Sequence, residues 1–193
     1  TCGRATRGDI RAAMATGADG FHFSLPVSPI HQRIWKKDAA WVIAKMREIS
    51  RIARDHFSYF SIGAQDASRG QPDFLREFYE EAALCGARRI RYADTTGRLN
   101  PLQAHEVIRD LRSITPVEIE FHAHNDLGMA TANTVAALLA GADCASVTVN
   151  GLGERAGNAA LEEVASALLH SAQIDLQLDI TRFGALSDLV AEA

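Results

Sequence analysis

Short runs of alternating apolar and polar residues recur along the chain, and each is followed by a stretch whose apolar residues lie three or four apart. Alternation with a period of two is typical of strands, and the longer spacing is typical of amphipathic helices. The predicted strands are residues 20–28, 59–66, 88–97, 117–126 and 144–151. The predicted helices are residues 8–16, 38–55, 71–85, 101–113, 129–140 and 158–170. This order predicts a series of βα units.

The residues between these elements support the same interpretation. Asn100 and Pro101 have the order of a helix N-cap and first helical residue. Glycine follows three of the predicted helices, in ATGAD, LCGAR and LAGAD, as is typical of helix C-caps. We find no linker or low-complexity segment, so we expect residues 1–193 to form a single domain.

The predicted strands each have one apolar and one polar face, whereas the strands of an open parallel sheet are usually apolar on both faces. The apolar face comprises Phe21, Phe23, Phe60, Ile62, Ile90, Tyr92, Val117, Ile119, Phe121, Val147 and Val149. The polar face comprises His22, Ser24, Ser61, Gln65, Arg89, Arg91, Thr95, Glu118, Glu120, His122, His124, Ser146, Thr148 and Asn150. An apolar face under helices and a polar face turned inward predict an α/β fold of the (β/α)8 barrel type.

Charged residues occupy the polar face of two successive strands. Arg89 and Arg91 lie one predicted strand before Glu118 and Glu120. Unpaired charges inside a barrel would be costly, so we predict that these arginines and glutamates form ion pairs.

The number of strands is too small for a closed barrel. Five strands are clear, and TCGR at the N-terminus has the pattern of the end of a sixth, whereas a closed barrel has eight. Either this is a partial barrel whose first strands lie upstream of Thr1, or the sheet is open.

Composition excludes several classes of function. The formal net charge is -4 with both signs interspersed, so no basic tract favours nucleic acid or a membrane surface. No apolar run approaches the roughly 20 residues of a membrane span. Cys2, Cys85 and Cys144 are far apart, which predicts reduced thiols in a cytoplasmic protein.

His122 and His124 are the first candidates for chemistry. They lie two apart near the end of a predicted strand, so their side chains share one face, roughly 6–7 Å apart along the strand. This is the end of the strand where barrel active sites lie. The pair can supply two ligands to a divalent metal, with Asn125 and Asp126 as orienting partners. The alternative is two histidines that form hydrogen bonds in a polar loop.

The segment NGLGERAGNAALEEV, residues 150–164, is the second candidate. Three glycines allow close approach of a ligand to the backbone: Gly151, Gly153 and Gly157. Asn158 is a candidate cap for the following helix, whose N–H groups suit an anionic group. Glu154 and Arg155 are expected to pair and brace the loop. The alternative is an ordinary βα loop.

Two further side chains face inward by their position in the strands. Thr95 is placed to hold a substrate carboxylate through its hydroxyl group, or to satisfy its own turn. His22, taken alone, is typical of a hydrogen-bonded core histidine.

Residues 121–164 resemble the signature region of the DRE-TIM metallolyase superfamily, and within it the acyl-CoA-dependent 2-oxoacid synthases. The matching patterns are H-x-H-N-D-x-G-x-A-x-A-N and N-G-x-G-E-R-x-G-N, with HFSLPVSPIH and ADTTGRLNP in the same order as in the family. The lyases of the superfamily have a different, Cys-bearing segment in place of GLGERAGN. The segment GMATAN, residues 128–133, most resembles the homocitrate synthases of nitrogen-fixing bacteria.

The resemblance implies a catalytic barrel domain that condenses acetyl-CoA with a 2-oxo acid, first 2-oxoglutarate to give homocitrate, and then hydrolyses the thioester. The alternatives are a 2-isopropylmalate or citramalate synthase, or a non-catalytic subunit that needs a partner chain. Family members are typically homodimers with a C-terminal extension, and we expect the given sequence to end before that extension.

The resemblance also implies roles for individual residues. His122 and His124 would bind a divalent metal (Mg, Mn or Zn), with Asn150 close to it. Thr95 and His22 would line the pocket for the 2-oxo acid. The loop would hold acetyl-CoA through Gly151, Gly153, Glu154, Arg155, Gly157 and Asn158.

The chain departs from the family pattern in two places. The R-[DE]-G-E-Q motif, which supplies the third metal ligand and a substrate-binding arginine, is absent, so we expect the chain to start at the third barrel strand. Gln65 occupies a position where the family usually has a glutamate linked to acid–base chemistry. Ser61 supplies no cation for a distal carboxylate, so the 2-oxo acid stays open.

Overall fold

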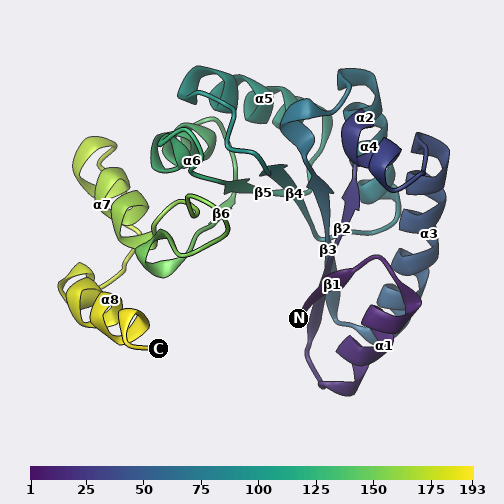
Figure 1. Cartoon of the computed structure of the whole chain (residues 1–193), viewed down its shortest axis with the longest axis horizontal. Helices are drawn as coiled ribbons and strands as arrows, with labels where there is room; N and C mark the ends of the chain where they lie inside the picture. Colours follow the sequence, from purple (N-terminus) through teal and green to yellow (C-terminus); the bar gives the residue numbers. More distant parts are fainter. The chain divides into compact units, whose positions relative to one another are not determined.

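The computed structural model describes residues 1–193 and contains one six-stranded sheet (Figure 1). The strands are β1 (Cys2–Arg4), β2 (Gly20–Pro26), β3 (Tyr59–Gln65), β4 (Arg89–Asp94), β5 (Glu118–Ala123) and β6 (Cys144–Ser146). They lie in the order β1-β2-β3-β4-β5-β6, and the first three pairings are parallel. Strands that follow one another in sequence order are typical of a (β/α)8 barrel, because doubly wound sheets reverse their order. The fold is therefore an α/β partial barrel, as predicted, and TCGR does form a strand.

The helices connect these strands in the predicted alternation. They are α1 (Arg7–Ala15), α2 (Pro29–Ile34), α3 (Ala39–His56), α4 (Pro72–Leu84), α5 (Pro101–Ile114), α6 (Ala130–Leu139), α7 (Leu161–Ser171) and α8 (Phe183–Ala191). Single 3-10 turns are η1 (Ala67–Arg69), η2 (Val149–Gly151) and η3 (Ile180–Arg182). Two helices, α2 and α8, were not predicted from the sequence, and α2 has only six residues, too few for a clear helical period. No helix is both long enough and apolar enough to cross a membrane.

The strands predicted over residues 88–97 and 117–126 end earlier, at Asp94 and Ala123, and the predicted boundaries differ most at one further strand and one helix. The strand predicted over residues 144–151 ends at Ser146, and the helix predicted from residue 158 begins at Leu161. The chain turns between them because Gly151 donates its N–H to the Thr148 carbonyl group, which forms η2. Asn150 lies in this turn with φ 60°, so its predicted place on the inward face of a strand is wrong.

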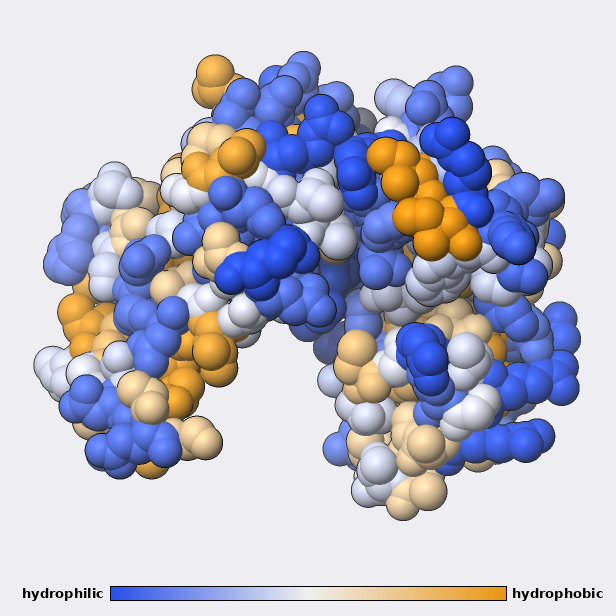
Figure 2. Space-filling model, viewed as in Figure 1, coloured by the Kyte–Doolittle hydropathy of each residue, from blue (hydrophilic) through white to orange (hydrophobic).

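The chain consists of two compact units, which are described separately. Unit 1 comprises residues 1–93 and 110–120, and unit 2 comprises residues 94–109 and 121–193. In a space-filling view, polar residues cover most of the visible surface and apolar side chains are exposed in separate patches (Figure 2).

The core of unit 1 confirms the predicted apolar strand faces. Phe21 and Phe23 on β2 are buried, and they lie in register with Phe60 and Ile62 on β3. The rings of Phe21 and Phe23 stack with their centroids 5.8 Å apart. Helix α3 contributes buried apolar residues as well: Val42, Ile43, Met46, Ile49 and Ala53. Of the predicted apolar face, Val117, Val147 and Val149 are only half-buried.

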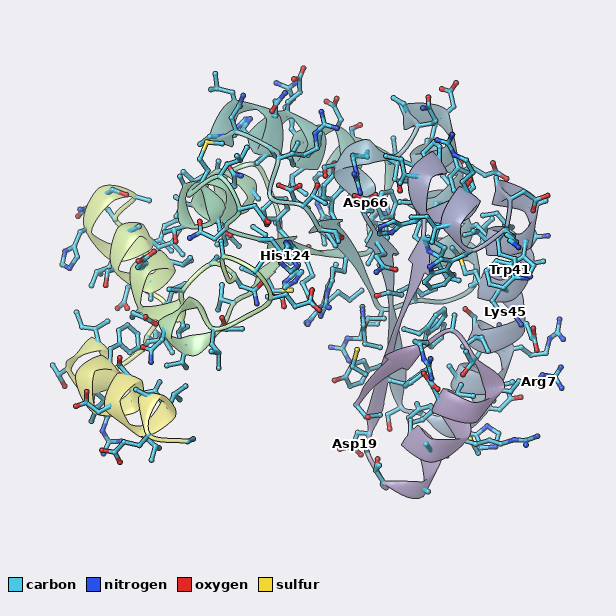
Figure 3. All side chains as sticks on the ribbon, viewed as in Figure 1. Arg7, Asp19, Trp41, Lys45, Asp66 and His124 are labelled. Carbon is cyan, nitrogen blue, oxygen red and sulfur yellow. The ribbon has the colours of Figure 1, made fainter.

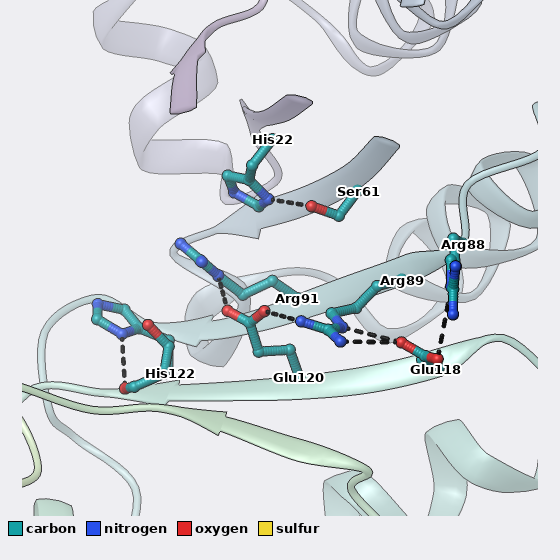
Figure 4. A network of polar contacts seen from close by, with 9 residues as sticks. His22, Ser61, Arg88, Arg89, Arg91, Glu118, Glu120 and His122 are labelled. Atoms are coloured by element: carbon teal, nitrogen blue, oxygen red, sulfur yellow. Dashed lines mark hydrogen bonds and ion pairs between the residues drawn. The ribbon is translucent and has the colours of Figure 1, made fainter. Parts of the chain in front are cut away.

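The predicted ion pairs of unit 1 are present (Figure 4). Arg89 Nη2 lies 3.0 Å from Glu118 Oε2, and Arg89 Nη1 lies 3.5 Å from Glu120 Oε2. Arg91 donates a hydrogen bond from Nε to Glu120 Oε1. The Glu120 side chain is only 8% exposed, whereas that of Glu118 is 38% exposed. Neighbouring strands β4 and β5 are thus joined by a charge network that is most buried at Glu120.

Candidate active site

The two histidines of the H-x-H segment lie together in unit 2. His122 is in β5, and His124 follows the last residue of that strand (His124 is labelled in Figure 3). Their ring centroids are 4.9 Å apart and the ring planes are at 86°. The two imidazoles therefore point to the same side of the strand end, as predicted.

The ring of His122 is oriented by a backbone group. Its Nδ1 lies 3.2 Å from the carbonyl oxygen of Ser146, at the end of β6. A carbonyl oxygen only accepts, so Nδ1 carries the proton, which in a neutral imidazole leaves the lone pair on Nε2. A backbone carbonyl that holds one ring nitrogen is the usual support of a metal-binding histidine.

His124 is buried and has an unpartnered ring nitrogen. The residue is 8% exposed, and its Nδ1 is buried without a hydrogen-bond partner. Burial, and then the positive charge of Arg155, lower the pKa of His124, which favours the neutral ring. A buried orphan nitrogen is costly, and a neutral imidazole is the form that binds metals.

His122 and His124 thus fit two positions of a divalent metal site. A complete set is not present, because no group of three or more His, Cys, Asp or Glu side chains has the arrangement of a metal site. The donors seen are two imidazoles, which suit Zn, Fe or Ni better than Ca.

Asp94 fixes the turn in which Thr95 lies. The Asp94 side chain is fully buried, and it accepts N–H groups from Arg98 at 3.2 Å and Leu99 at 3.0 Å. Its carbonyl oxygen accepts from Gly97 at 3.0 Å and from His124 at 3.4 Å. Thr95, which is half-buried, was predicted from the sequence as a site residue, and Asp94 was not. The Asp-Thr-Thr-Gly pattern is the turn signal that could have identified it.

The glycines of the 150–158 loop serve the packing of the loop itself. A Cβ atom on Gly157 would lie 2.2 Å from the Gly151 carbonyl oxygen, and one on Gly153 would lie 2.5 Å from Asn158 Nδ2. Gly157 has φ 89°, which only glycine adopts readily. The Gly157 carbonyl oxygen accepts the N–H of Asn125 at 2.9 Å. The loop is therefore closed on itself and fastened to the segment that follows β5.

The helix cap predicted at Asn158 is wrong. The N-cap of α7 is Ala160, and it makes no side-chain cap. Asn158 instead donates from Nδ2 to the Leu152 carbonyl oxygen at 3.2 Å, while its Oδ1 is buried without a partner. Its place inside the loop, two residues before the cap, explains the difference.

The side chain of Asn150 is held by α8. Its Nδ2 donates to the Ser187 carbonyl oxygen at 2.9 Å, and the Ser187 hydroxyl group donates to Asn150 Oδ1. Both amide atoms thus contact a helix that the sequence analysis missed. A role of Asn150 beside the metal stays a prediction.

Arg155 has a stronger partner than the predicted Glu154. It donates from Nε and Nη2 to the two carboxylate oxygens of Asp126, at 2.6 Å and 2.8 Å. Nη2 also donates to the Thr95 carbonyl oxygen at 2.7 Å. Glu154 lies 3.6 Å from Nη1 and its side chain is 80% exposed. The guanidinium group also lowers the pKa of Asp126 through these hydrogen bonds.

In unit 1, His22 contacts two serine hydroxyl groups, and Figure 4 shows the contact with Ser61. Its Nδ1 is 2.8 Å from Ser61 Oγ, and its Nε2 is 3.0 Å from Ser24 Oγ. Gly63 faces Ser24 in the β2–β3 register, and a Cβ atom there would lie 2.4 Å from Ser24 Oγ. His22 is buried and hydrogen-bonded, as expected for a core histidine.

Gln65 ends β3 beside a strained acidic residue. Gln65 is half-buried, and its carbonyl oxygen accepts the N–H of Val27 at 3.1 Å. The next residue, Asp66, is fully buried with φ 63° and accepts from Arg69 Nε at 2.8 Å and 3.0 Å. His31 Nε2 lies 3.8 Å from Asp66 Oδ2. None of these three neighbours of Gln65 was predicted from the sequence as a site residue.

Comparison with known proteins gives consistent matches over the whole chain. Residues 1–190 match the family model described as HMGL-like. The chain is 44% identical over 191 residues to 2-isopropylmalate synthase 2 of Caldanaerobacter subterraneus subsp. tengcongensis, covering 98% of this chain and 50% of the relative. It is 42% identical over 191 residues to the homocitrate synthase of Frankia alni, with 98% and 54% covered.

A third relative is the 2-phosphonomethylmalate synthase of Streptomyces rubellomurinus, at 40% identity over 191 residues, with 98% and 51% covered. The chain therefore spans about half the length of the curated relatives it matches.

Solved structures share the fold. The HMG-CoA lyase of Brucella melitensis superposes with a TM-score of 0.84 at 19% identity, covering 99% of this chain and 72% of that chain. The hydroxymethylglutaryl-CoA lyase of Pseudomonas aeruginosa superposes with a TM-score of 0.81 at 22% identity, with 94% and 65% covered.

Proposed function

Because this chain belongs to the HMGL-like family, we propose that the intact protein is an acyltransferase that condenses acetyl-CoA with a 2-oxo acid. The products named in three relatives support this class: 2-isopropylmalate, homocitrate and 2-phosphonomethylmalate. Each has one carbon that carries a hydroxyl group, a carboxyl group and a carboxymethyl arm. Addition of an acetyl unit to the keto carbon of a 2-oxo acid, followed by thioester hydrolysis, leaves this substructure.

The observation that carries the proposal is the histidine pair. His122 and His124 have rings 4.9 Å apart, one held by a backbone carbonyl group and the other with a buried orphan nitrogen. This pair stands at the strand end where barrel active sites lie, and the closed glycine-rich loop is fastened beside it. A divalent metal bound there would supply Lewis acidity toward the keto oxygen of the 2-oxo acid.

The chain's own residues have the following proposed roles. His122 and His124 bind the metal. The Thr95 hydroxyl group binds the carboxylate of the 2-oxo acid, and His22, held by Ser24 and Ser61, contributes to its pocket. Backbone groups of the 150–158 loop contact acetyl-CoA. We propose that residues 1–193 act as one catalytic domain and that the intact protein is a homodimer.

The reaction is balanced without a redox step. A base takes a proton from the acetyl methyl group, and the resulting carbanion forms a bond to the keto carbon. The keto oxygen takes up a proton and becomes the tertiary hydroxyl group. Water then cleaves the thioester, which releases free CoA and the carboxymethyl arm as a carboxylate.

For the 2-oxo acid, we propose 2-oxoglutarate first, because the sequence around Ala130 to Asn133 resembles that of homocitrate synthases. The alternatives are the 2-oxo acids that give 2-isopropylmalate and citramalate. The relatives at 44% and 42% identity are a 2-isopropylmalate synthase and a homocitrate synthase, so identity does not choose between them. A role in nitrogen fixation depends on homocitrate as the product.

Release of CoA thiol from acetyl-CoA, assayed with 2-oxoglutarate, 2-oxoisovalerate and pyruvate in parallel, tests the proposal. We expect divalent-metal-dependent release with one preferred acid. His122→Ala is expected to lower turnover at least about 100-fold, since a metal ligand is lost. His105→Ala, a change of an exposed histidine on α5, is the matched control and is expected to retain activity. Unchanged turnover of the His122 variant would rule out the proposed site.

A second candidate is a non-catalytic relative that acts with a partner chain. Gln65 is the observation that favours it, because an amide group does not exchange a proton as a carboxylate does. Metal binding at His122 without thiol release from any 2-oxo acid would support this candidate.

A further inference from the structure

Arg155 connects three separate loops of unit 2. Its guanidinium group donates to both oxygens of Asp126, after β5, and to the carbonyl oxygen of Thr95, after β4. Arg155 itself belongs to the loop after β6, so one side chain ties the ends of three successive strands. The backbone at Arg155 has φ 57°, a region that non-glycine residues adopt rarely and at a cost.

All three contacts surround the segment that carries His124. Asp126 lies two residues beyond His124, and Thr95 directly follows Asp94, whose carbonyl oxygen accepts the N–H of His124. A Cβ atom on Gly97 would lie 2.5 Å from the His124 carbonyl oxygen. The loop after β4 therefore packs directly against the backbone of His124, which leaves no room for a side chain at Gly97.

The ion pair of Arg155 and Asp126 contributes little to stability through its charge alone. The side chains of Arg155 and Asp126 are 43% and 25% exposed, and exposed ion pairs stabilise weakly. Its two parallel hydrogen bonds, by contrast, define distance and orientation, as a forked guanidinium–carboxylate contact does. The Arg155–Asp126 contact is therefore better explained by the orientation that it imposes than by the stability that it contributes.

We infer that Arg155 is a positioning residue for the histidine pair and not a contact of acetyl-CoA. Through Asp126 and Thr95 it sets the position of His124 relative to His122, and Asp126 holds the guanidinium group in the required orientation. This inference rests on the proposed metal site, and it changes the role that the sequence resemblance implied for Arg155.

Titration of the intact protein with Co²⁺, followed by the visible absorption of the bound ion, tests the inference. Metal-bound histidines respond to their supporting residues by about 10–100-fold in affinity. We expect Arg155→Gln and Asp126→Asn each to weaken Co²⁺ binding within this range and to alter its absorption spectrum. The double variant is expected to be no weaker than either single variant, because both remove the same contact.

Arg155→Lys keeps the positive charge but loses the two parallel hydrogen-bond donors of the guanidinium group, so we expect an intermediate Co²⁺ affinity. If Arg155→Gln does not fold, Arg155→Lys and Asp126→Asn together provide the test. Arg47→Gln is the matched control. Arg47 makes an equally forked pair with Glu81, at 2.7 Å for both bonds, in unit 1. Its loss is expected to leave the Co²⁺ affinity and spectrum unchanged.

Two results would overturn the inference. The first is a Co²⁺ affinity within twofold of the wild type in both Arg155→Gln and Asp126→Asn. The second is a KM for acetyl-CoA that rises more than fivefold in Arg155→Gln but not in Asp126→Asn, with kcat unchanged, since that pattern indicates direct contact. Failure of the proposed function looks different: wild-type protein would then bind no Co²⁺ that His122→Ala removes.

Discussion

At the scale of single residues, Gln65 most limits the proposed chemistry. It ends β3, and its backbone accepts a hydrogen bond from Val27. These backbone contacts do not depend on the side chain, so a glutamate fits the same place in the strand. Positioned acid–base groups contribute about 10²–10⁴-fold to rates.

We therefore predict that Gln65→Glu raises the turnover of acetyl-CoA at least about tenfold at neutral pH. Steady-state thiol release with the preferred 2-oxo acid is the measurement. Gln71→Glu, at the exposed residue before α4, introduces the same charge and is expected to have no effect. Equal turnover in wild type and Gln65→Glu would show that another group already performs the acid–base step.

At the scale of elements, the loop between β6 and α7 is closely packed around its glycines. Gly157 combines φ 89° with a contact to the Gly151 carbonyl oxygen that leaves no room for a Cβ atom. Gly86, past the end of α4, has φ 85° but no atom within 4 Å of the Cβ position. The two glycines share a backbone conformation and differ in their surroundings.

Gly157→Ala is predicted to destabilise the protein by about 3 kcal/mol or more, because strain and overpacking add. Gly86→Ala is predicted to cost about 1–2 kcal/mol, from the left-handed conformation alone. Urea denaturation of the two variants measures the difference. Similar losses for both would mean that the loop moves away from Gly151 at little cost.

A second prediction at this scale concerns helices α3 and α4. Arg47 on α3 lowers the pKa of Glu81 on α4 by donating two hydrogen bonds to its carboxylate. The folded-state pKa lies below the unfolded value of about 4.3. The resulting stability is therefore present above that pH and is lost as the pH falls through the lowered pKa.

Glu81→Gln should reduce the free energy of unfolding by up to about 1 kcal/mol at pH 7, because one partner is exposed. The difference from wild type should shrink as the pH falls below about 4. Chemical denaturation at pH 7, 5 and 3.5 follows this trend. Glu80→Gln, at the exposed neighbouring glutamate, should show no such pH dependence, and a difference independent of pH would contradict the assigned ion pair.

Regular elements could be predicted from sequence, whereas irregular ones could not. Periodicity located six of the eight α-helices, but α2 spans only Pro29–Ile34 and has too few residues for a period. The two partners of Arg155 lie 29 and 60 residues away, and Asn150 contacts Ser187 across 37 residues. The alternation of a strand also predicted the wrong position for Asn150. The chain leaves the strand in a turn that is closed by the hydrogen bond from the Gly151 N–H to the Thr148 carbonyl oxygen.

At the scale of the whole molecule, the sheet is the feature that the sequence predicted best. Its polar face could be read because charges of opposite sign occupy matching positions one strand apart. Arg91 and Glu120 are joined in the structure, as are Arg89 and Glu118. The burial of each ion pair could not be predicted from the sequence, because it depends on the surrounding packing.

Glu120→Ala is predicted to destabilise the protein by about 3–5 kcal/mol, since it leaves arginine charge without its buried partner. Glu118→Ala is the matched control. Its side chain is 38% exposed, against 8% for Glu120, so its loss should cost about 1 kcal/mol or less. Equal losses in urea denaturation would contradict the greater burial of Glu120.

The pocket of His22 has a consequence for proton movement. Each ring nitrogen meets a serine hydroxyl group, Ser61 on one side and Ser24 on the other. A hydroxyl group rotates, and it can donate or accept. Either tautomer of a neutral imidazole can therefore form both hydrogen bonds with no heavy atom displaced. This geometry would let a proton enter the ring at one nitrogen and leave from the other, between Ser61 on β3 and Ser24 on β2.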